Sequence, residues 1–292
     1  MTRLHVIDGT YELFRAHFSR RPARSDHQGR DVKAVHGLLS SLLSLLDEPD
    51  EAVTHLAVAF DHPIESFRND LFGGYKDSSG VDDAVIAQFD LAEQAVASLG
   101  VTVWSMDTHE ADDALASAAK HFADDVDQVR ILTPDKDLGQ VVRGKHVVQV
   151  DRAREREFDE DGVRDRLGVS PTSVPDLLAL VGDTADGIPG LPGFGAKSAG
   201  LLLNRYLHLD AVPPDAGDWD IAVRGADRLA STLRDRLDDA LLYRHLATLV
   251  DNLDLECRLA DLRFDGTDRS TWQDFCAPLN FEGLIERPTT WR

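Results

Sequence analysis

The sequence lacks features that would place it in several other protein classes. It has two cysteines, Cys257 and Cys276, and no CxxC pair. Neither a disulfide framework nor a cysteine zinc site is therefore indicated. No apolar run approaches the roughly 20 residues that a membrane span requires, and the first residues, MTRLHVIDGT, lack the apolar segment of a signal peptide. We expect a cytoplasmic protein that contacts no membrane.

Positive charge is also scarce. The chain has 31 Lys and Arg against 52 Asp and Glu, which gives a formal net charge of -21. Proteins that bind nucleic acids usually show a basic surface, so this excess argues at first against such a partner. Acids gathered in a site can, however, be neutralised by bound cations. We assign the remaining acids to a solvated surface.

The apolar pattern predicts an α/β part followed by a helical part. Short apolar runs favour strands near 4–8, 55–61, 101–104, 129–133 and 147–150, and helical periodicity lies between them. After residue 170 the strand signal ends, and 175–207 and 226–250 favour helices. We predict an α/β domain over 1–170 and a helical region over 171–292, whose tail packs back on the α/β part. The charged run 152–165 is expected to be solvated.

Acidic residues recur just beyond the predicted strands. Asp8 and Asp61 each end a strand, and ligands of parallel α/β sheets bind beyond the strands' carboxyl ends. A single such Asp is usually a cap or a turn residue. Further acids open a helix or follow the fourth strand: Glu110, Asp112 and Asp113, then Asp135 and Asp137. The dipole of a helix would favour acids at its start in any case, so capping and metal binding both stay open.

A glycine-rich stretch over 180–203 combines two kinds of site. Asp183 and Asp186 are three residues apart and share one face of a helical turn. Glycines then allow a tight turn and close approach to another molecule, before a helix that begins near Ala196. The first turn of such a helix offers unpaired N–H groups to a phosphate, with Lys197 and Ser198 beside it. The alternative is a Gly/Pro connector that carries two solvated aspartates.

The acids together require cations. Many carboxylates that converge without neutralising charge would repel one another strongly. Ligand sets made of oxygen suit magnesium or manganese, and no His/Cys group suggests zinc. Two such ions about 4 Å apart can activate a water and stabilise the leaving oxygen of a phosphodiester. Joined to a phosphate-binding turn, this is the chemistry of a nuclease.

The motifs that carry these acids also resemble a known family. VIDG, AFD, SFR to GGYK, HEADDALAS, ILTPDKDL and GDTADGIPGLPGFGAKSA occur in the order and spacing of the 5′→3′ exonuclease and flap endonuclease family, which includes the nuclease domain of bacterial DNA polymerase I. The resemblance covers nearly the whole chain. It implies a PIN-like parallel-sheet core, a helical arch near 68–98 and a helix-three-turn-helix module built by the glycine-rich stretch.

The resemblance also implies roles for particular residues. Two or three Mg²⁺ or Mn²⁺ ions would be held, the first by Asp8, Asp61, Glu110, Asp112 and Asp113, and the second by Asp135, Asp137, Asp183 and Asp186. Asp8, Asp113 and Asp135 would also act in catalysis, with Arg68 and Lys76 on the scissile phosphate. Tyr75 could stack on a base or pack in the core. The DNA duplex would be gripped, with a K⁺ ion, by Gly190, Gly193, Gly195, Lys197 and Ser198.

Three positions depart from the family's pattern. Asp77-Ser78-Ser79-Gly80 stands where an Arg is common, the arch that follows carries four acids and no cation, and Gly187 replaces an Asn. The first two indicate weaker steering of a 5′ single strand.

We expect a stand-alone, monomeric nuclease, with no polymerase domain following, that acts on DNA with a free 5′ end, flap, nick or gap. The alternatives are a structure-specific DNA-binding protein with weak catalysis and a PIN-type ribonuclease. The latter class lacks the helix-three-turn-helix stretch.

Overall fold

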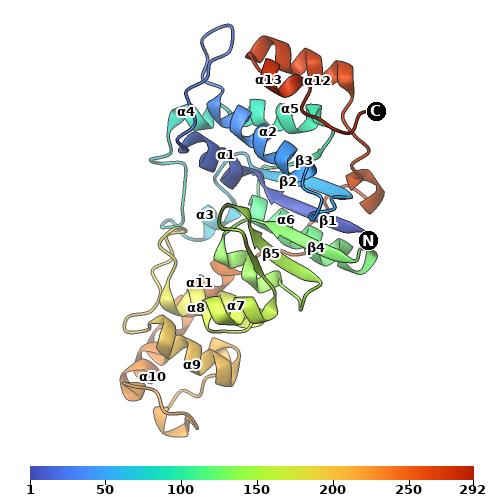
Figure 1. Ribbon diagram of the computed structural model, residues 1–292. Helices are drawn as coiled ribbons and strands as arrows, with labels where there is room; N and C mark the ends of the chain where they lie inside the picture. Colours follow the sequence, from blue (N-terminus) through green and yellow to red (C-terminus); the bar gives the residue numbers. More distant parts are fainter. The chain divides into compact units, whose positions relative to one another are not determined.

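The computed structural model describes all residues, Met1–Arg292, and divides them into two compact units (Figure 1). Unit 1 contains Met1–Ser66, Ser78–Thr133 and Asp251–Arg292. Unit 2 contains Phe67–Asp77 and Pro134–Val250. Each unit has its own core, so each is described by itself. The expected domain boundary at residue 170 stays a prediction.

Unit 1 is built on a parallel sheet whose strands lie in the order β3-β2-β1-β4. β1, β2 and β4 are nearly continuous runs of buried residues, as expected where helices cover a parallel sheet, whereas the edge strand β3 buries only Trp104. In the register, Asp8 lies opposite Ala59 and Ile7 opposite Leu132, so β1, β2 and β4 end at the same edge. All four occur where the apolar pattern predicts them: β1 (Arg3–Asp8), β2 (His55–Asp61), β3 (Thr102–Met106) and β4 (Gln128–Leu132).

Helices pack against both sides of this sheet (Figure 1). α2 lies against α1 and α5, while α6 runs across all four strands. α2 buries nine of its residues, including Leu38, Leu42 and Leu45, because its apolar positions recur at helical spacing. The helices of this layer are α1 (Gly9–His17), α2 (Lys33–Leu46), α4 (Asp83–Ile86), α5 (Phe89–Ser98), α6 (Ala111–Phe122) and η1 (Ala123–Asp125).

The C-terminal tail belongs to unit 1. Trp272 and Phe281 are fully buried, and the Trp272 indole donates to the Leu284 carbonyl at 3.1 Å. The Thr267 hydroxyl donates to the carbonyl of Leu99, at the end of α5, at 2.8 Å. The tail therefore lies in the same unit as the parallel sheet. Its elements are η7 (Leu259–Leu262), α12 (Arg269–Cys276), η8 (Ala277–Leu279) and α13 (Glu282–Ile285).

The charged run in unit 2 is more ordered than its sequence predicts. β5 (Val147–Asp151) pairs in antiparallel fashion with a three-residue strand, β6 (Arg156–Phe158), after η3 (Arg152–Arg154). α7 (Glu160–Leu167) follows, with Asp159 as its N-cap and Gly168 as its left-handed C-cap. β6 exposes Arg156 and Glu157, so it lacks the apolar alternation by which a strand is recognised. The expectation of a solvated run missed both elements.

α8 lies at the centre of unit 2 and packs on α9 and α11. Leu178, Leu202 and Leu246 belong to the shared core. The two helices expected over 226–250 are present. The helical elements are α3 (Phe67–Leu71), η2 (Lys136–Val141), η4 (Pro171–Ser173), α8 (Val174–Val181), α9 (Ala196–Tyr206), η5 (Leu209–Ala211), η6 (Ala216–Asp218), α10 (Ala226–Asp235) and α11 (Leu237–Ala247).

The turns between α8 and α9 hold the glycine-rich stretch, so helix, turns and helix follow one another as the helix-three-turn-helix module requires. None of the chain's helices combines the length and the apolar composition that crossing a membrane would require.

Candidate active site

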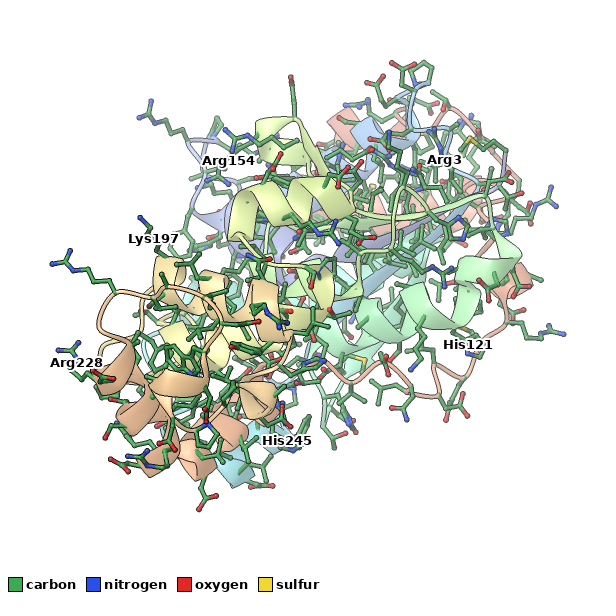
Figure 2. The ribbon with its side chains drawn as sticks, turned by 90° about the horizontal axis from the view of Figure 1, so that it is seen from below. Arg3, His121, Arg154, Lys197, Arg228 and His245 are labelled. Carbon is green, nitrogen blue, oxygen red and sulfur yellow. The ribbon has the colours of Figure 1, made fainter.

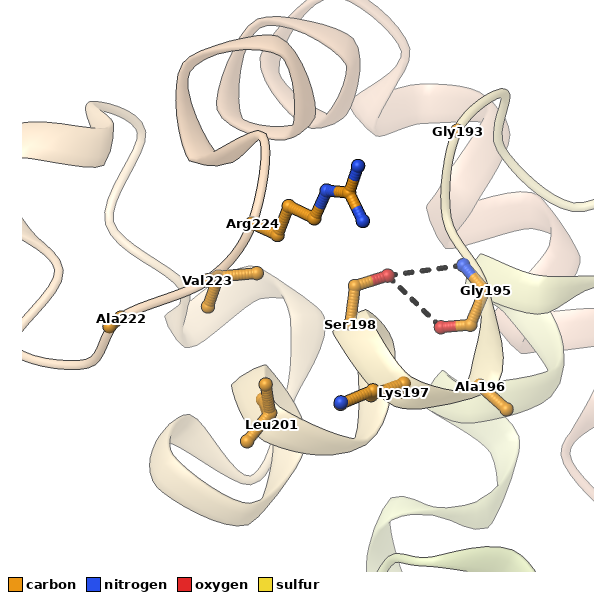
Figure 3. Close-up of a pocket in the computed structure, with 9 residues that line it drawn as sticks. All are labelled: Gly193, Gly195, Ala196, Lys197, Ser198, Leu201, Ala222, Val223 and Arg224. Carbon is orange, nitrogen blue, oxygen red and sulfur yellow. Dashed lines mark hydrogen bonds between the residues drawn. The ribbon is translucent and has the colours of Figure 1, made fainter.

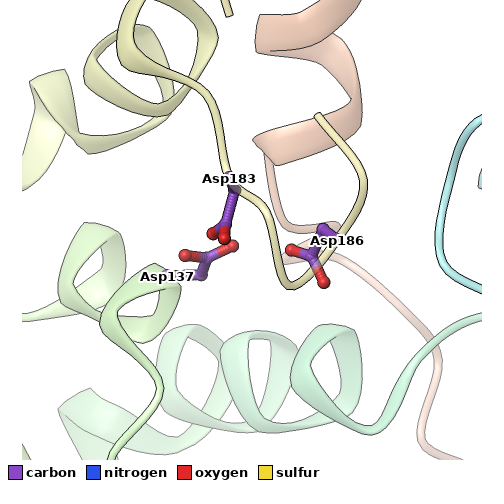
Figure 4. A group of neighbouring side chains, drawn as sticks. All are labelled: Asp137, Asp183 and Asp186. Carbon is purple, nitrogen blue, oxygen red and sulfur yellow. The ribbon is translucent and has the colours of Figure 1, made fainter. Parts of the chain in front are cut away.

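Three aspartates of unit 2 converge where the turn after α8 faces η2. Asp137, Asp183 and Asp186 each offer a carboxylate oxygen, and these atoms lie within 4.8 Å of one another (Figure 4). Asp135 caps the start of η2, where its Oδ1 accepts from the Asp137 N–H at 3.0 Å. Four of the acids expected to bind the second metal therefore belong to unit 2, and three of them form one cluster.

Within this cluster, Asp137 lacks hydrogen bonds that would compensate for its burial. Burial, and then the negative charges of Asp135 and Asp186, raise the pKa of the Asp137 carboxyl well above its ordinary value. The Oδ1 atom of Asp137 is buried and has no hydrogen-bond partner. A hard divalent cation would supply the missing interaction and stabilise the ionised carboxylates, so the donor set fits magnesium or manganese.

Two lysines stand beside the cluster. Lys76 Nζ lies 2.9 Å from Asp186 Oδ1. Lys136 pairs with Asp183 and lies 3.8 Å from an Asp137 oxygen. Burial alone would lower the pKa of Lys136, but the attraction of Asp137 and the bond to Asp183 raise it on balance. The Lys136 ammonium is thus held charged beside the cluster.

The backbone between the two aspartates is a tight turn closed on itself. Asp183 and Ile188 exchange two backbone hydrogen bonds of 2.8 Å. Gly187 has φ of +75°, and a Cβ added to it would overlap the carbonyl oxygen of Gly74. A residue with a side chain therefore has no room at this position.

In unit 1, the acids at the strand ends are fixed by donors around them. Asp8 Oδ1 accepts from the Tyr11 N–H at 2.8 Å and so caps α1, and its Oδ2 accepts from the Thr133 hydroxyl at 2.9 Å. Asp61 Oδ1 accepts from the Ala111 N–H at 2.7 Å, at the start of α6. The capping role considered from the sequence is therefore real, and it leaves further lone pairs on each carboxylate.

The helix-opening acids of unit 1 form a second linked group. Glu110 is the N-cap of α6, its N–H donates to Asp113 Oδ2 at 3.0 Å, and its Oε1 accepts from the Ser66 hydroxyl at 2.8 Å. Asp113 is fully buried and Asp112 is half-buried. Metal binding by these five acids stays a prediction.

Arg68 and Tyr75 lie deeper than their expected roles require. Arg68 is 1% exposed, and its guanidinium donates to the Leu246 carbonyl at 2.8 Å and to the Thr248 carbonyl at 3.1 Å, at the end of α11. Such bonds stabilise the C-terminus of a helix. Tyr75 is 6% exposed in the core of unit 2. Of its two possible roles, packing is the one observed, and a DNA contact by either residue stays a prediction.

The glycine turn before α9 borders a pocket of about 630 Å³ (Figure 3). Gly190 and Gly193 have φ of +71° and +90°, so glycine is the favoured residue at both. Gly195 is extended, with φ of -141°, and the place of its missing side chain is open. The turn itself would therefore accept another residue at position 195. What the lack of a side chain provides there is room for a ligand to approach the backbone. The Ser198 hydroxyl caps the helix through Gly195, and Lys197 lines the pocket.

Sequence reasoning missed several residues that the structure brings to these sites. Thr133 and Ser66 hold Asp8 and Glu110, and Arg224 lines the pocket at the glycine turn. Thr133 could have been found, because it precedes the Asp pair at the end of β4. Ser66 and Arg224 are far in sequence from the residues they meet, and no local pattern marks them.

Two family models match the chain. One, described as the N-terminal resolvase-like domain of 5′-3′ exonucleases, matches residues 3–168. The other, the C-terminal SAM fold of 5′-3′ exonucleases, matches residues 169–270. Together they cover residues 3–270.

Curated relatives include proteins of very different length. DNA polymerase I of Pseudomonas aeruginosa is 35% identical over 269 residues, which cover 89% of this chain and 28% of the polymerase. The 5′-3′ exonuclease of Aquifex aeolicus is 28% identical over 98% of this chain and 95% of its own. The chain thus spans less than a third of that polymerase and nearly all of that exonuclease.

Solved structures share the fold at low identity. The T5 5′-exonuclease with bound zinc ions superposes with a TM-score of 0.68, at 16% identity, over 95% of this chain and 99% of its own. The catalytic core of Rad2 with a DNA substrate gives 0.63, at 13% identity, over 96% and 88%. The strand-end acids, the helix-turns-helix stretch and the matches of both family models lead to one assignment: the chain belongs to the 5′-3′ exonuclease family.

Proposed function

We propose that this protein is a divalent-metal-dependent nuclease that hydrolyses DNA phosphodiesters as a 5′→3′ exonuclease, a 5′-flap endonuclease or both. It would act as a cytoplasmic monomer on DNA with a free 5′ end, flap, nick or gap. The observation that carries the proposal is the Asp137, Asp183 and Asp186 cluster, with the orphaned Oδ1 atom of Asp137. Such a group requires a cation, and the family to which the chain belongs supplies the expected reaction.

The chain's own residues have distinct tasks in this reaction. Asp137, Asp183 and Asp186 would hold one Mg²⁺ or Mn²⁺ ion, with Asp135 beside them. The acids of unit 1 (Asp8, Asp61, Glu110, Asp112 and Asp113) would hold another. When bound, the ions supply an activated water and stabilise the leaving oxygen. Lys76 would then leave Asp186 and meet the scissile phosphate, since its ammonium is already held there.

The glycine turn would bind the DNA duplex at a place separate from the acidic cluster. Gly190, Gly193 and Gly195 let the backbone approach a phosphate, and the N–H groups that open α9 face it. Residues of this turn, among them Gly190, Gly193 and Gly195, would hold the expected K⁺ ion, which would neutralise part of the phosphate charge. Omitting K⁺ should weaken duplex binding without affecting the metal cluster.

The proposal is tested by digestion of a 5′-labelled flap duplex with Mg²⁺, with Mn²⁺ and with a chelator. Short labelled products from the 5′ end are expected with either metal, and none with the chelator. Asp183→Asn serves as the inactive control, because it removes one cluster oxygen and keeps the side chain's size. Product sizes separate the exonuclease from the flap endonuclease.

Binding without cleavage would favour the alternative class. A wild-type protein that binds the flap duplex tightly, but yields no product above the Asp183→Asn background with either metal, would be a structure-specific DNA-binding protein. Equal cleavage by wild type and Asp183→Asn would show that the cluster is not the catalytic centre.

A further inference from the structure

The basic side chains of the helical part of unit 2 differ in whether they have acidic partners. Most of its arginines are paired: Arg205 with Asp220, Arg234 with Asp215 at 3.1 Å, Arg236 with Asp239 at 2.8 Å and Arg244 with Asp210 at 2.9 Å. Lys197, Arg224 and Arg228 make neither a hydrogen bond nor an ion pair. In a chain with 52 acids and 31 cations, three unpaired cations in one region are unexpected.

These three cations gather around the glycine turn. Lys197 and Arg224 line the same pocket, and Figure 3 shows the Arg224 guanidinium directed toward Ser198 and the turn. Arg228 comes from the first turns of α10, and its Nη2 lies 2.6 Å from the place of a Gly193 Cβ. The absence of a side chain at Gly193 therefore makes room for this guanidinium. Figure 2 shows Lys197 and Arg228 projecting outward.

The rest of the pocket suits a sugar-phosphate backbone. Leu201, Val223 and the two alanines of its lining are apolar, and the cations and the Ser198 hydroxyl stand beside them. No aromatic side chain lines the pocket. Single strands are held without sequence preference largely by stacking on aromatic rings, so this surface lacks the feature that they use. Cations around an exposed glycine suit contact with the backbone phosphates of a double strand.

We propose that Arg224 and Arg228 contact backbone phosphates of double-stranded DNA and extend the duplex-binding surface from the glycine turn to the start of α10. The proposal rests on the proposed function and adds two residues that neither the motifs nor the sequence pattern mark. The glycine turn determines the position of the Arg228 side chain, because the guanidinium occupies the space next to Gly193 where a side chain would otherwise lie. Arg224 faces the turn from across the pocket.

The test is a titration of labelled duplex DNA, monitored by fluorescence anisotropy over a series of salt concentrations. A chelator is present throughout, so that the DNA is not cleaved. Arg224→Gln and Arg228→Gln should each weaken binding roughly tenfold near 0.1 M salt and reduce the slope of log K against log salt by about 1, the value of one phosphate contact. Arg234→Gln is the matched control, since it lies on the same helix and already pairs with Asp215. It should bind within about twofold of wild type.

Two further measurements sharpen the result. The losses should be larger on a duplex than on a single strand of equal length. Gly193→Ala should displace the Arg228 guanidinium, so its effect on binding should not add to that of Arg228→Gln but should add to that of Arg224→Gln.

The outcomes separate this inference from the proposed function. Wild-type salt slopes in both arginine variants, or equal losses on single and double strands, would overturn the inference. Duplex binding by the wild type without any metal-dependent cleavage would overturn the proposed nuclease and leave the two arginine contacts standing. A wild type that binds no duplex would overturn both.

Discussion

At the residue scale, the protonation of the Asp137 carboxyl is determined by the residues that surround it. Asp137 holds its proton more firmly than an ordinary aspartate because it is buried among Asp135, Asp186 and Asp183. The adjacent Lys136 carries the charge that partly offsets them. This arrangement binds a cation well and is unfavourable without one, so the cluster should respond to metal even where no DNA is present.

We therefore expect Asp137→Asn to separate stability from metal binding. Without metal, the variant should melt at or above the wild-type temperature, because a neutral amide relieves the repulsion within the cluster. Added Mg²⁺ or Mn²⁺ should raise the melting temperature of the wild type through linkage and should raise that of the variant much less. Calorimetry with and without metal measures both effects. Equal metal-induced shifts in the two proteins would remove Asp137 from the site.

Gly187 gives a second residue-scale prediction. Replacing Gly187 by Asn should destabilise this chain by about 2 kcal/mol or more, because the new Cβ would meet the Gly74 carbonyl oxygen. The shift would also disturb Lys76, whose N–H donates to the Asp186 carbonyl at 3.0 Å. Urea denaturation measures the loss. Gly73→Asn is the control, since the space at Gly73 is open. An unchanged midpoint for Gly187→Asn would contradict the packing described for this loop.

At the element scale, α2 carries a histidine whose environment opposes its charge. Burial first, and then the charges of Arg24 and Arg21, lower the pKa of His36 to about 4. The ring packs edge-on against Phe281, with centroids 5.1 Å apart. Since the unfolded histidine titrates near 6.5, the unfolded state binds the proton more readily. The contribution of neutral His36 to the free energy of unfolding is thus complete above about pH 6.5, and it is lost as the pH falls toward 4.

His36→Gln should consequently flatten the fall in stability between pH 6.5 and pH 4, by on the order of 1 kcal/mol after allowance for its partial exposure. Urea midpoints across that range measure it. His121→Gln, a change at an exposed histidine of α6, should leave the wild-type pH dependence in place. If both variants follow the wild-type curve, the proton on His36 has no part in the acid sensitivity.

Three of the four acids in the segment around α4 and α5 have a local structural partner. Asp82 caps α4 and lies 3.2 Å from His17, while Asp90 and Glu93 lie 3.3 and 3.0 Å from His62. Asp83 is exposed, with no such bond. Asp83 is therefore the acid of this segment whose charge can be changed without removing a cap or a histidine contact.

Asp83→Lys should then raise cleavage of 5′-flapped substrates relative to recessed duplexes, most clearly at low salt. The measurement is the ratio of the two rates across a salt series. Asp82→Asn would be an unsuitable probe, because it removes the cap of α4 along with the charge. A ratio that Asp83→Lys leaves unchanged at every salt concentration would mean that the single strand does not pass this segment.

At the scale of the whole molecule, the net charge of -21 acts on stability as a sum. Self-repulsion of like charges opposes the compact state and is screened by salt. Raising sodium chloride from about 0.05 to about 0.5 M should therefore raise the melting temperature of the metal-free protein. Scanning calorimetry measures this change. A lower melting temperature at high salt would contradict this. It would show that the ion pairs stabilise the fold by more than repulsion between the unpaired acids destabilises it.

The sequence predicts the parts of this molecule that local rules determine. Aspartates such as Asp8 and Asp61 follow apolar runs, which identify them as residues at strand ends. Because neighbouring parallel strands end at the same edge of the sheet, the sequence also predicts that these aspartates lie along that edge. Arg68 and Gly187 could not be predicted in this way, because their environments come from Leu246 and Gly74, which no spacing connects to them. The strand β6 was missed since its residues are charged and exposed.

The route of the chain has a consequence for engineering by recombination. Unit 2 is made from two inserted segments, 67–77 and 134–250, so the backbone passes from one unit to the other four times. A chimera that exchanges residues 169–270 with a relative would carry away Thr267 and η7, which belong to unit 1. Exchanging 67–77 together with 134–250 would keep both cores whole. Crossover points in a family library therefore belong at the four unit boundaries, and a single crossover anywhere in the chain splits at least one core.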